Sequence, residues 1–381
     1  MMLEPTIPRR RRWPIFLPIA LVVVLALGWS AVWYYAAAKA ETAIAGWREK
    51  EARLGRVYSC GAQTIGGFPF RIEVRCREPA AELRNVDAPL ALKGADVLVA
   101  AQIYQPDLLI GEFTGPLALG DLGRSPDFTA NWSLAQTSVR GTPGAPERVS
   151  VVFEGASFNR VNDGQNHPLV SAKRFELHGR MSELSGDQAV NELALRLVAA
   201  SAPWLHPVAA DPLDADVNAV LRGLKDFTPK PWAVRFRELQ ANGGQIEIKN
   251  ARVQQGDTLA VGSGVLGLSP TGRLEGQLAL TVAGIENLLP KLGIERLAPQ
   301  VAPQVKGLDR LGPALGALDK LSPQLGNIAR QQAGAGIAAS IGALGEQTQL
   351  EGKRAIALPL RFANGVAFLG PIKLGQIPPL F

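Results

Sequence analysis

The sequence predicts a mainly β fold: an elongated antiparallel meander sheet, arranged as a groove or a sandwich, with a few helices and one N-terminal transmembrane helix. Segments in which apolar and polar residues alternate recur about every 10 to 15 residues. Turns rich in Gly, Pro, Asn and Asp separate these segments, and such short connections favour antiparallel neighbours. An uncharged run that follows four arginines predicts the membrane helix.

The N-terminal run is long enough to span a membrane. Residues 13–38 are 26 positions without a charged side chain, and a helix needs about 20 to cross a bilayer. We expect residues 1–12 to form a basic cytoplasmic tail, because arginines keep their side of a membrane helix in the cytoplasm. Aromatic side chains that suit the membrane interface mark the ends of the anchor, namely Trp13, Trp29, Trp33, Tyr34 and Tyr35.

A second interpretation of this run stays open. The small residues in Ala38-Lys39-Ala40 fit a site at which a signal peptide is cleaved, and cleavage would release the protein to the far side of the membrane. The length of the run favours the anchor, because a signal peptide has an apolar stretch of only about 7 to 15 residues. Under both interpretations the rest of the chain is exported.

The only two cysteines flank one short segment. In an exported, oxidising compartment an even cysteine count predicts a disulfide. Joining Cys60 to Cys76 would close a loop of about 17 residues and contribute on the order of 3 kcal/mol to stability. Two buried free thiols are the alternative. No histidine lies within 90 residues of either cysteine in the sequence, which argues against a catalytic or metal-binding pair.

The exported part is expected to begin with a stalk and a first set of strands. A thin apolar stripe at helical spacing over 39–56 continues the membrane helix, and the region of Gly55 ends it. The first β-rich part covers 57–210. Its first strand is expected from Phe70 onward, after a turn at Gly66-Gly67-Phe68-Pro69.

A linking helix is expected over 211–229, before a second β-rich part over 230–381. Prolines bound the segment, and its apolar residues keep helical spacing at Val217, Val220, Leu221 and Leu224. The second part should open with a four-stranded meander, because Val234 and Phe236 alternate with arginines and three further alternating segments follow. Such a sheet has one apolar and one polar face.

The last strand of that meander carries an expected apolar ligand face, made of Leu274, Leu278, Leu280 and Val282. A helical Pro/Gly-rich insertion follows over 285–345, and Leu308, Leu311 and Leu315 within it are expected to cover the face. The insertion either packs on the sheet, acts as a lid or lies on the membrane surface. Two closing strands are expected after it.

Three segments of the sequence resemble a known family. They are YSCGAQTIGGFPFRIEVRC, LAVGSGVLGLSPTGRLEGQLALTVAGIENLLPKL and the closing ANGVAFLGPIKLGQIPPLF. Together they resemble the bacterial envelope family known as domain of unknown function 2125, over nearly the whole chain. Residues 262–289 also look like the C-terminal pattern of AsmA-like proteins, which are anchored in the inner membrane and built of β-strands that form an apolar groove. We therefore expect a bacterial inner-membrane anchor, or a cleaved signal peptide, and a periplasmic body.

The residues point to no catalytic site. His167, His178 and His206 lack metal-ligand spacing, and the GSGVLG segment at 262–267 is followed by an expected strand where a dinucleotide site needs a helix. The basic residues form no patch interleaved with aromatics, so nucleic acid is not an expected partner. We expect no enzyme activity, cofactor or metal ion, and the resembled families supply no catalytic residues.

Two functions remain, and the pattern of apolar positions does not separate them. The protein either binds or transfers lipid, or another apolar envelope molecule, through an apolar β-groove, or it is a non-catalytic periplasmic scaffold that docks an envelope protein partner. An open groove and the closed core of a sandwich share one sequence pattern.

Overall fold

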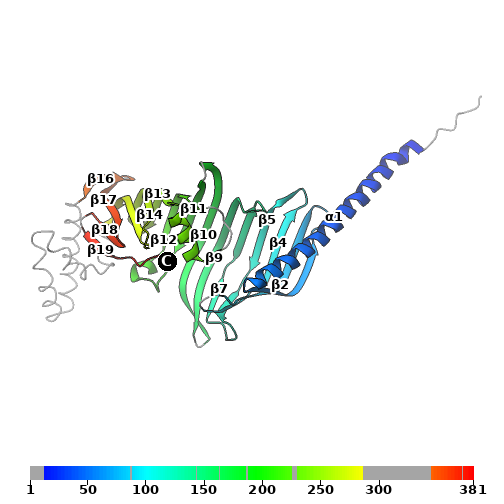
Figure 1. Cartoon of the computed structure of the whole chain (residues 1–381), viewed down its shortest axis with the longest axis horizontal. Coiled ribbons are helices and arrows are strands. Elements are labelled where there is room, and N and C mark those ends of the chain that lie inside the picture. The colour runs from blue at the N-terminus through cyan, green and yellow to red at the C-terminus, as the bar shows by residue number, and fades with distance from the viewer. Residues whose placement is uncertain are drawn as a thin grey trace, which may run out of the picture.

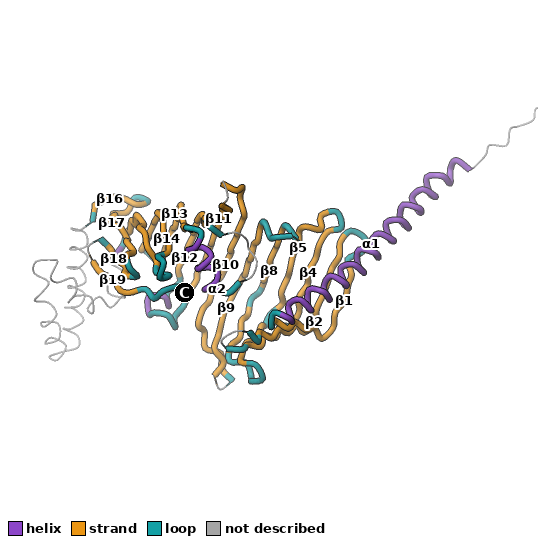
Figure 2. Tube along the Cα trace, in the orientation of Figure 1, coloured by secondary structure: helices purple, strands orange, loops and turns teal. Residues whose placement is uncertain are grey.

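One long helix and one large antiparallel sheet make up most of the described part of the chain (Figure 1, Figure 2). The structure is a computed structural model that describes residues 13–85, 88–142, 144–162, 164–185, 188–224, 230–285, 345–370 and 372–381. Helix α1 (Trp13–Arg53) leads into a sheet of 19 strands. A second helix, α2 (Trp232–Ala241), and a 3-10 turn (Pro207–Ala210) interrupt the succession of strands. The expected mainly β, antiparallel fold is confirmed.

The strands follow one another with short connections. Those of the first half are β1 (Arg56–Gly66), β2 (Arg71–Leu83), β3 (Leu90–Lys93), β4 (Asp96–Gln102), β5 (Gln105–Thr114), β6 (Leu117–Asp121), β7 (Phe128–Asn131), β8 (Leu134–Arg140) and β9 (Arg148–Asn162). Those of the second half are β10 (Gln165–Ser185), β11 (Gln188–Ala200), β12 (Leu213–Arg222), β13 (Gln245–Gln255), β14 (Thr258–Leu268), β15 (Leu274–Ala283), β16 (Glu346–Leu350), β17 (Lys353–Ala363), β18 (Val366–Leu369) and β19 (Ile372–Gln376).

Sequential pairing makes the sheet a meander. Between β2 and β9 the strands are broken into two pieces: β4, β5 and β8 join one half of β2 to one half of β9, and β3, β6 and β7 join the other halves. From β9 to β15 each strand pairs with the next along the chain. Strand β17 then pairs with β15, β16 and β18, and β19 closes the sheet.

The sheet is one curved layer. Figures 1 and 2 show α1 crossing the end formed by β1 and β2 and then projecting away, while β18 and β19 lie at the opposite end. All 19 strands belong to the same hydrogen-bonded sheet. The described strands therefore form an open sheet, and not the two packed sheets of a sandwich.

The prediction of a linking helix over 211–229 is wrong, because Leu213–Arg222 form strand β12. This strand pairs with β11 on one side and β13 on the other, so the sheet continues without a break. Its residues also alternate with period two, since Asp214, Asp216 and Asn218 are exposed while Ala215 between them is buried. Strands β11 and β13 favour the period of two, because only a strand between them can form hydrogen bonds with the backbone N–H and C=O groups of both.

The prediction of the first strand of the four-stranded meander is also wrong, because the segment from Trp232 to Ala241 forms helix α2. Pro231 precedes the helix, where its fixed φ suits a helix start. Leu239 is 3% exposed and anchors the helix. An alternation of only four residues, as at Val234 to Arg237, fits one face of a helix equally well.

The structure also bears on the predicted stalk, on the segment that follows it and on the predicted insertion. Helix α1 ends at Arg53 and a turn at Gly55 follows, close to the expected end of the stalk. The segment that precedes the turn at Gly66-Gly67 is itself a strand, β1, which the sequence had not indicated. The insertion over 285–345, with its repeat, lies outside the described residues from 286 to 344.

Candidate functional site

The sheet carries a continuous apolar surface on one side. Residues directly opposite each other in neighbouring strands have their side chains on the same face. One row of such residues crosses 13 strands from β2 to β18: Ile72, Ala101, Leu109, Val139, Val149, Gly179, Leu193, Ala219, Ile248, Gly264, Leu278, Leu360 and Leu369. No residue of this row is polar.

Two further rows run beside it. One crosses 13 strands from β1 to β17: Ile65, Val74, Val99, Gly111, Thr137, Val151, Leu177, Leu195, Val217, Ala251, Gly262, Leu280 and Leu358. The other crosses nine strands from β8 to β17: Ala135, Phe153, Phe175, Leu197, Ala215, Val253, Ala260, Val282 and Ile356. We call these three rows the apolar face.

The dimensions of the apolar face follow from strand geometry. Neighbouring strands lie about 4.8 Å apart, so a row of 13 strands runs for roughly 58 Å along the curved sheet. Rows two residues apart are separated by about 6.6 Å, so three of them span roughly 13 Å. An acyl chain fits on a surface of this length and width.

Solvent exposure varies along the apolar face. Leu177 on β10 is 39% exposed. Its register partners Val151 and Leu195 are each only half-buried. Toward the end at β15 and β17 the exposure falls, and Val282 and Leu358 are 8% and 4% exposed. Of the residues in the three rows, Leu177 on β10 is therefore the most exposed large apolar side chain.

The opposite face of the same strands is polar and bears ion pairs. On β13, Glu247 lies between Arg222 at 3.4 Å and Lys249 at 2.5 Å. The hydrogen bond from Lys249 lowers the pKa of Glu247 below its usual range, and Arg222 adds to this effect. On the same face Arg252 donates to Glu351 at 3.0 and 3.1 Å. This face behaves as an ordinary solvated surface.

The expected ligand-face residues are part of the apolar face. Leu278, Leu280 and Val282 lie in its three rows, and Leu274 continues the same side of β15 opposite Leu268. The expected cover, Leu308, Leu311 and Leu315, lies outside the described residues. The strand residues predicted for the ligand face all lie on β15, whereas the register extends the same face over strands of both halves. Alternation in each strand was the available signal, but only the register shows that the rows are continuous.

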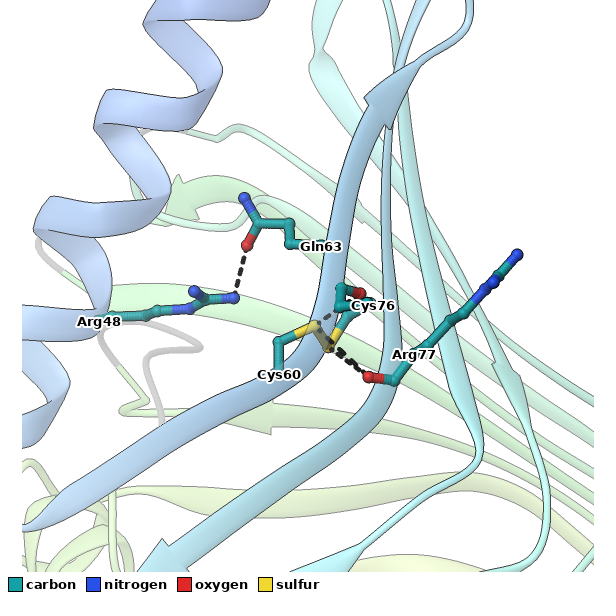
Figure 3. The surroundings of a disulfide bond; sticks show 6 residues. Arg48, Cys60, Gln63, Cys76 and Arg77 are labelled. Atoms are coloured by element: carbon teal, nitrogen blue, oxygen red, sulfur yellow. Dashed lines mark hydrogen bonds between the residues drawn. A yellow bond between two sulfur atoms is a disulfide. The ribbon is translucent and has the colours of Figure 1, made fainter.

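The structure contains the predicted disulfide between Cys60 and Cys76 (Figure 3). The two Cα atoms lie 5.7 Å apart on strands β1 and β2. Figure 3 shows Arg48 of α1 reaching toward the same place, where it donates to the amide oxygen of Gln63 at 2.7 Å. The disulfide thus fastens the two strands against which α1 packs.

Helix α1 is fastened to the sheet by its aromatic residues. The indole nitrogen of Trp29 donates to the carbonyl oxygen of Pro69 at 2.7 Å, and that of Trp33 donates to Arg71 at 2.9 Å. Further along the helix Trp47 stacks on Tyr58 at 4.8 Å. The expected interfacial residues Tyr34 and Tyr35 are exposed, and Trp13 begins the helix.

The apolar part of α1 has the properties of a membrane span. Its window of highest hydropathy has a mean hydropathy of 2.2, and 6% of that window is buried. A helix in the core of a soluble protein would be covered by other elements, and this one is not. The helix is therefore suited to anchor the protein in a membrane or to serve as a signal sequence.

The described residues offer little that resembles a catalytic centre. Among them no group of three His, Cys, Asp or Glu side chains is placed to hold a metal ion. A shallow polar hollow near the disulfide is lined by Gly61, Ala62, Arg77, Glu78, Ala95 and Asp96. Asn191 is fully buried, and its amide nitrogen donates to the carbonyl oxygen of Leu224 at 2.9 Å. Among the described strands, the apolar face is the surface feature that crosses most of the sheet.

Comparison with known proteins assigns the chain to a family. Residues 33–378 match the family of domain of unknown function 2125, described as an uncharacterized protein conserved in bacteria. Because this match covers nearly the whole chain, the protein belongs to that family. No curated protein matches the sequence.

Proposed function

We propose that this protein is a non-catalytic, membrane-anchored component of the bacterial envelope that binds the acyl chains of lipids on its apolar face. In this proposal α1 crosses the inner membrane with its N-terminus in the cytoplasm, and the sheet stands in the periplasm. The four arginines before the apolar run support this orientation. The disulfide suits the oxidising periplasm.

The observation that carries the proposal is the continuity of the apolar rows across the sheet. An exposed apolar patch on a soluble protein rarely exceeds a few hundred Å², and larger ones mark binding sites. Two of the rows run for roughly 58 Å and the third crosses nine strands, so the outline of the apolar face is larger than such a patch. This surface includes Leu177, which is 39% exposed, and its apolar character favours an apolar partner.

Acyl chains match the chemistry and shape of this surface. Burying a CH₂ group gains about 0.8 kcal/mol when it is fully removed from water, and a chain lying on an open face gains part of that for each carbon. The opposite, charged face of the sheet keeps the complex soluble, as Glu247 with Lys249 and Arg222 illustrates. An extended lipid chain therefore gains contacts along the sheet without a closed pocket.

The test compares lipid bound by matched variants of the full chain. Leu177 and Leu195 are register partners in the middle of the apolar face, so the double variant Leu177→Glu/Leu195→Glu places two charges there. The control, Ile110→Glu/Val265→Glu, changes two residues of the polar face that are 41% and 42% exposed, close to the 39% of Leu177. Lipid is extracted from each detergent-purified protein and counted per chain by mass spectrometry.

We expect the Leu177/Leu195 variant to retain less lipid per chain than the wild type, and the control variant to retain as much. Lipid held around α1 is the same in all three proteins, so a difference reports on the sheet. Circular dichroism checks that strand content is unchanged. Equal lipid in all three folded proteins would overturn the proposal and would favour the scaffold function, in which a protein partner covers the face.

A further inference from the structure

The hairpin between β1 and β2 reaches the level of the membrane span. Trp29 and Trp33 hold its tip through the carbonyl oxygens of Pro69 and Arg71. Phe68 packs edge-on against Trp33 with ring centroids 5.6 Å apart, and Trp33 is only 6% exposed as a result. The tip is therefore a fixed part of the helix surface at this position.

The depth of that position follows from the sequence of α1. Both tryptophans belong to the uncharged run over 13–38, and Lys39 is the first charged residue after it. Trp29 lies ten residues before Lys39, which is about 15 Å along a helix. The hydrocarbon core is about 30 Å thick and needs roughly 20 residues of a helix. A core over 13–32 fits this run, and it puts Trp29 three residues inside the end of the core and Trp33 just beyond it, at the interface.

The tip presents aromatic side chains at this depth. Phe68 is 54% exposed and Phe70 is 63% exposed. Tyr104, in the turn between β4 and β5, is 69% exposed. This turn lies beside the tip, because the amide of Ile103 donates to the carbonyl oxygen of Phe70 at 3.0 Å. Three exposed aromatic residues thus share one edge of the sheet next to the helix.

We propose that Phe68, Phe70 and Tyr104 insert into the interface of the bilayer that α1 spans, so that the sheet rests on the membrane at this edge. The inference depends on the membrane anchoring stated in the proposed function. Aromatic side chains with an apolar body favour the interface between headgroups and acyl chains, and tyrosine adds a hydroxyl that stays hydrated there. The partner of this edge is the bilayer itself.

This docking brings the apolar face to the source of its ligand. Ile72 starts the first row two residues after Phe70, and its partner Ala101 lies three residues before Tyr104. The rows then run from this edge across β5 and β8 toward the far end of the sheet. A lipid leaving the outer leaflet of the inner membrane reaches the apolar face here without crossing water.

Spin-label accessibility tests the docking on the full chain. Cysteine is introduced at Tyr104 or Phe70, and a nitroxide reagent labels the free thiol while Cys60 and Cys76 stay in their disulfide. The positive control is Leu25→Cys, 63% exposed on the span, and the water controls are Trp204→Cys and Trp232→Cys, 61% and 77% exposed elsewhere on the protein. Each protein is reconstituted in vesicles of phosphatidylethanolamine and phosphatidylglycerol.

We expect the ratio of oxygen to nickel-chelate accessibility to be several-fold higher at Tyr104→Cys and Phe70→Cys than at the two water controls. Water-like values at both positions, with a lipid-like value at Leu25→Cys, would overturn the docking and leave the anchor intact. Water-like values at Leu25→Cys as well would overturn the anchor and the docking together. Lipid binding on the apolar face is measured independently at Leu177 and Leu195.

Discussion

Arg174 holds two carboxylates on the polar face of the sheet. Its guanidinium donates to Glu154 at 2.7 Å and also to Glu176. The hydrogen bond from Arg174 lowers the pKa of Glu176 below its ordinary value, against the smaller opposing effect of burial. The side chain of Glu176 is 15% exposed, so the pair is only partly screened by water. Protonation of the Glu176 carboxylate therefore lowers the stability of the folded state.

The sign of this linkage gives a pH-dependent prediction. A carboxyl with a lowered pKa stabilises the folded state above its unfolded pKa of about 4.3, and the contribution is lost as the pH falls through the folded pKa. We expect Glu176→Gln to lower the free energy of unfolding, measured by urea denaturation at pH 7, by up to about 1 kcal/mol. The difference in unfolding free energy between this variant and the wild type should shrink as the pH falls, and vanish once Glu176 is protonated in the folded state. Glu275→Gln, exposed on β15, is the control, and a difference that stays constant with pH would contradict the assignment.

At the scale of elements, long alternation was a reliable guide and short alternation was not. Strands β15 and β17 follow from alternation over many residues, which only a half-buried strand explains. The residues of β12 satisfy two periods, because helical spacing of Val217, Val220 and Leu221 coexists with the alternation that starts at Asp214. Pairing with β11 and β13 decides between the periods, and a single sequence contains no sign of those partners.

Two valines on opposite faces of β12 allow a matched pair of lysine substitutions. Val217 lies between Leu195 and Ala251 on the apolar face, whereas Val220 lies between Glu192 and Glu247 on the polar face. We expect Val217→Lys to destabilise the fold by roughly 2 kcal/mol, because it places a charge among apolar partners. Val220→Lys should change stability by less than about 0.5 kcal/mol, because a surface lysine meets two carboxylates.

Urea denaturation of the two lysine variants distinguishes a strand from a helix at β12. A helix with the spacing noted in the sequence would bury both valines on one stripe, so both lysines would destabilise it alike. Equal losses in the two variants would therefore contradict the strand, and with it the continuity of the apolar rows through the middle of the sheet.

The contact between α1 and the β1–β2 hairpin was outside the reach of sequence reasoning. The aromatic cluster from Trp29 to Tyr35 and the turn at Phe68-Pro69 were both visible as motifs. Their hydrogen bonds join residues 40 and 38 positions apart, and no periodicity reports a contact of that kind. The disulfide could be predicted from the sequence, because the only two cysteines of an exported chain are expected to pair with each other.

At the scale of the whole molecule, one sheet joins the long apolar helix α1 to a distant edge. Figure 1 shows α1 at the end formed by β1 and β2, and β18 and β19 at the other end. The apolar rows connect these ends with only Thr137 as a polar member of the first two. A compact domain of this length would fold its apolar surface inward. The open sheet instead leaves its apolar face without a second layer, and in our proposal a lipid covers this face.

The most direct measurement of lipid on the apolar face is a photocrosslinking scan along β11 in living cells. Benzoylphenylalanine replaces each residue from 192 to 197 in turn, and the purified chain is analysed by mass spectrometry for adducts. We predict phospholipid adducts at Leu193, Leu195 and Leu197, and none at Glu192, Ala194 and Arg196, because successive side chains of a strand point to opposite faces. Protein adducts at the three leucines, or lipid adducts without this alternation, would contradict lipid binding on the apolar face.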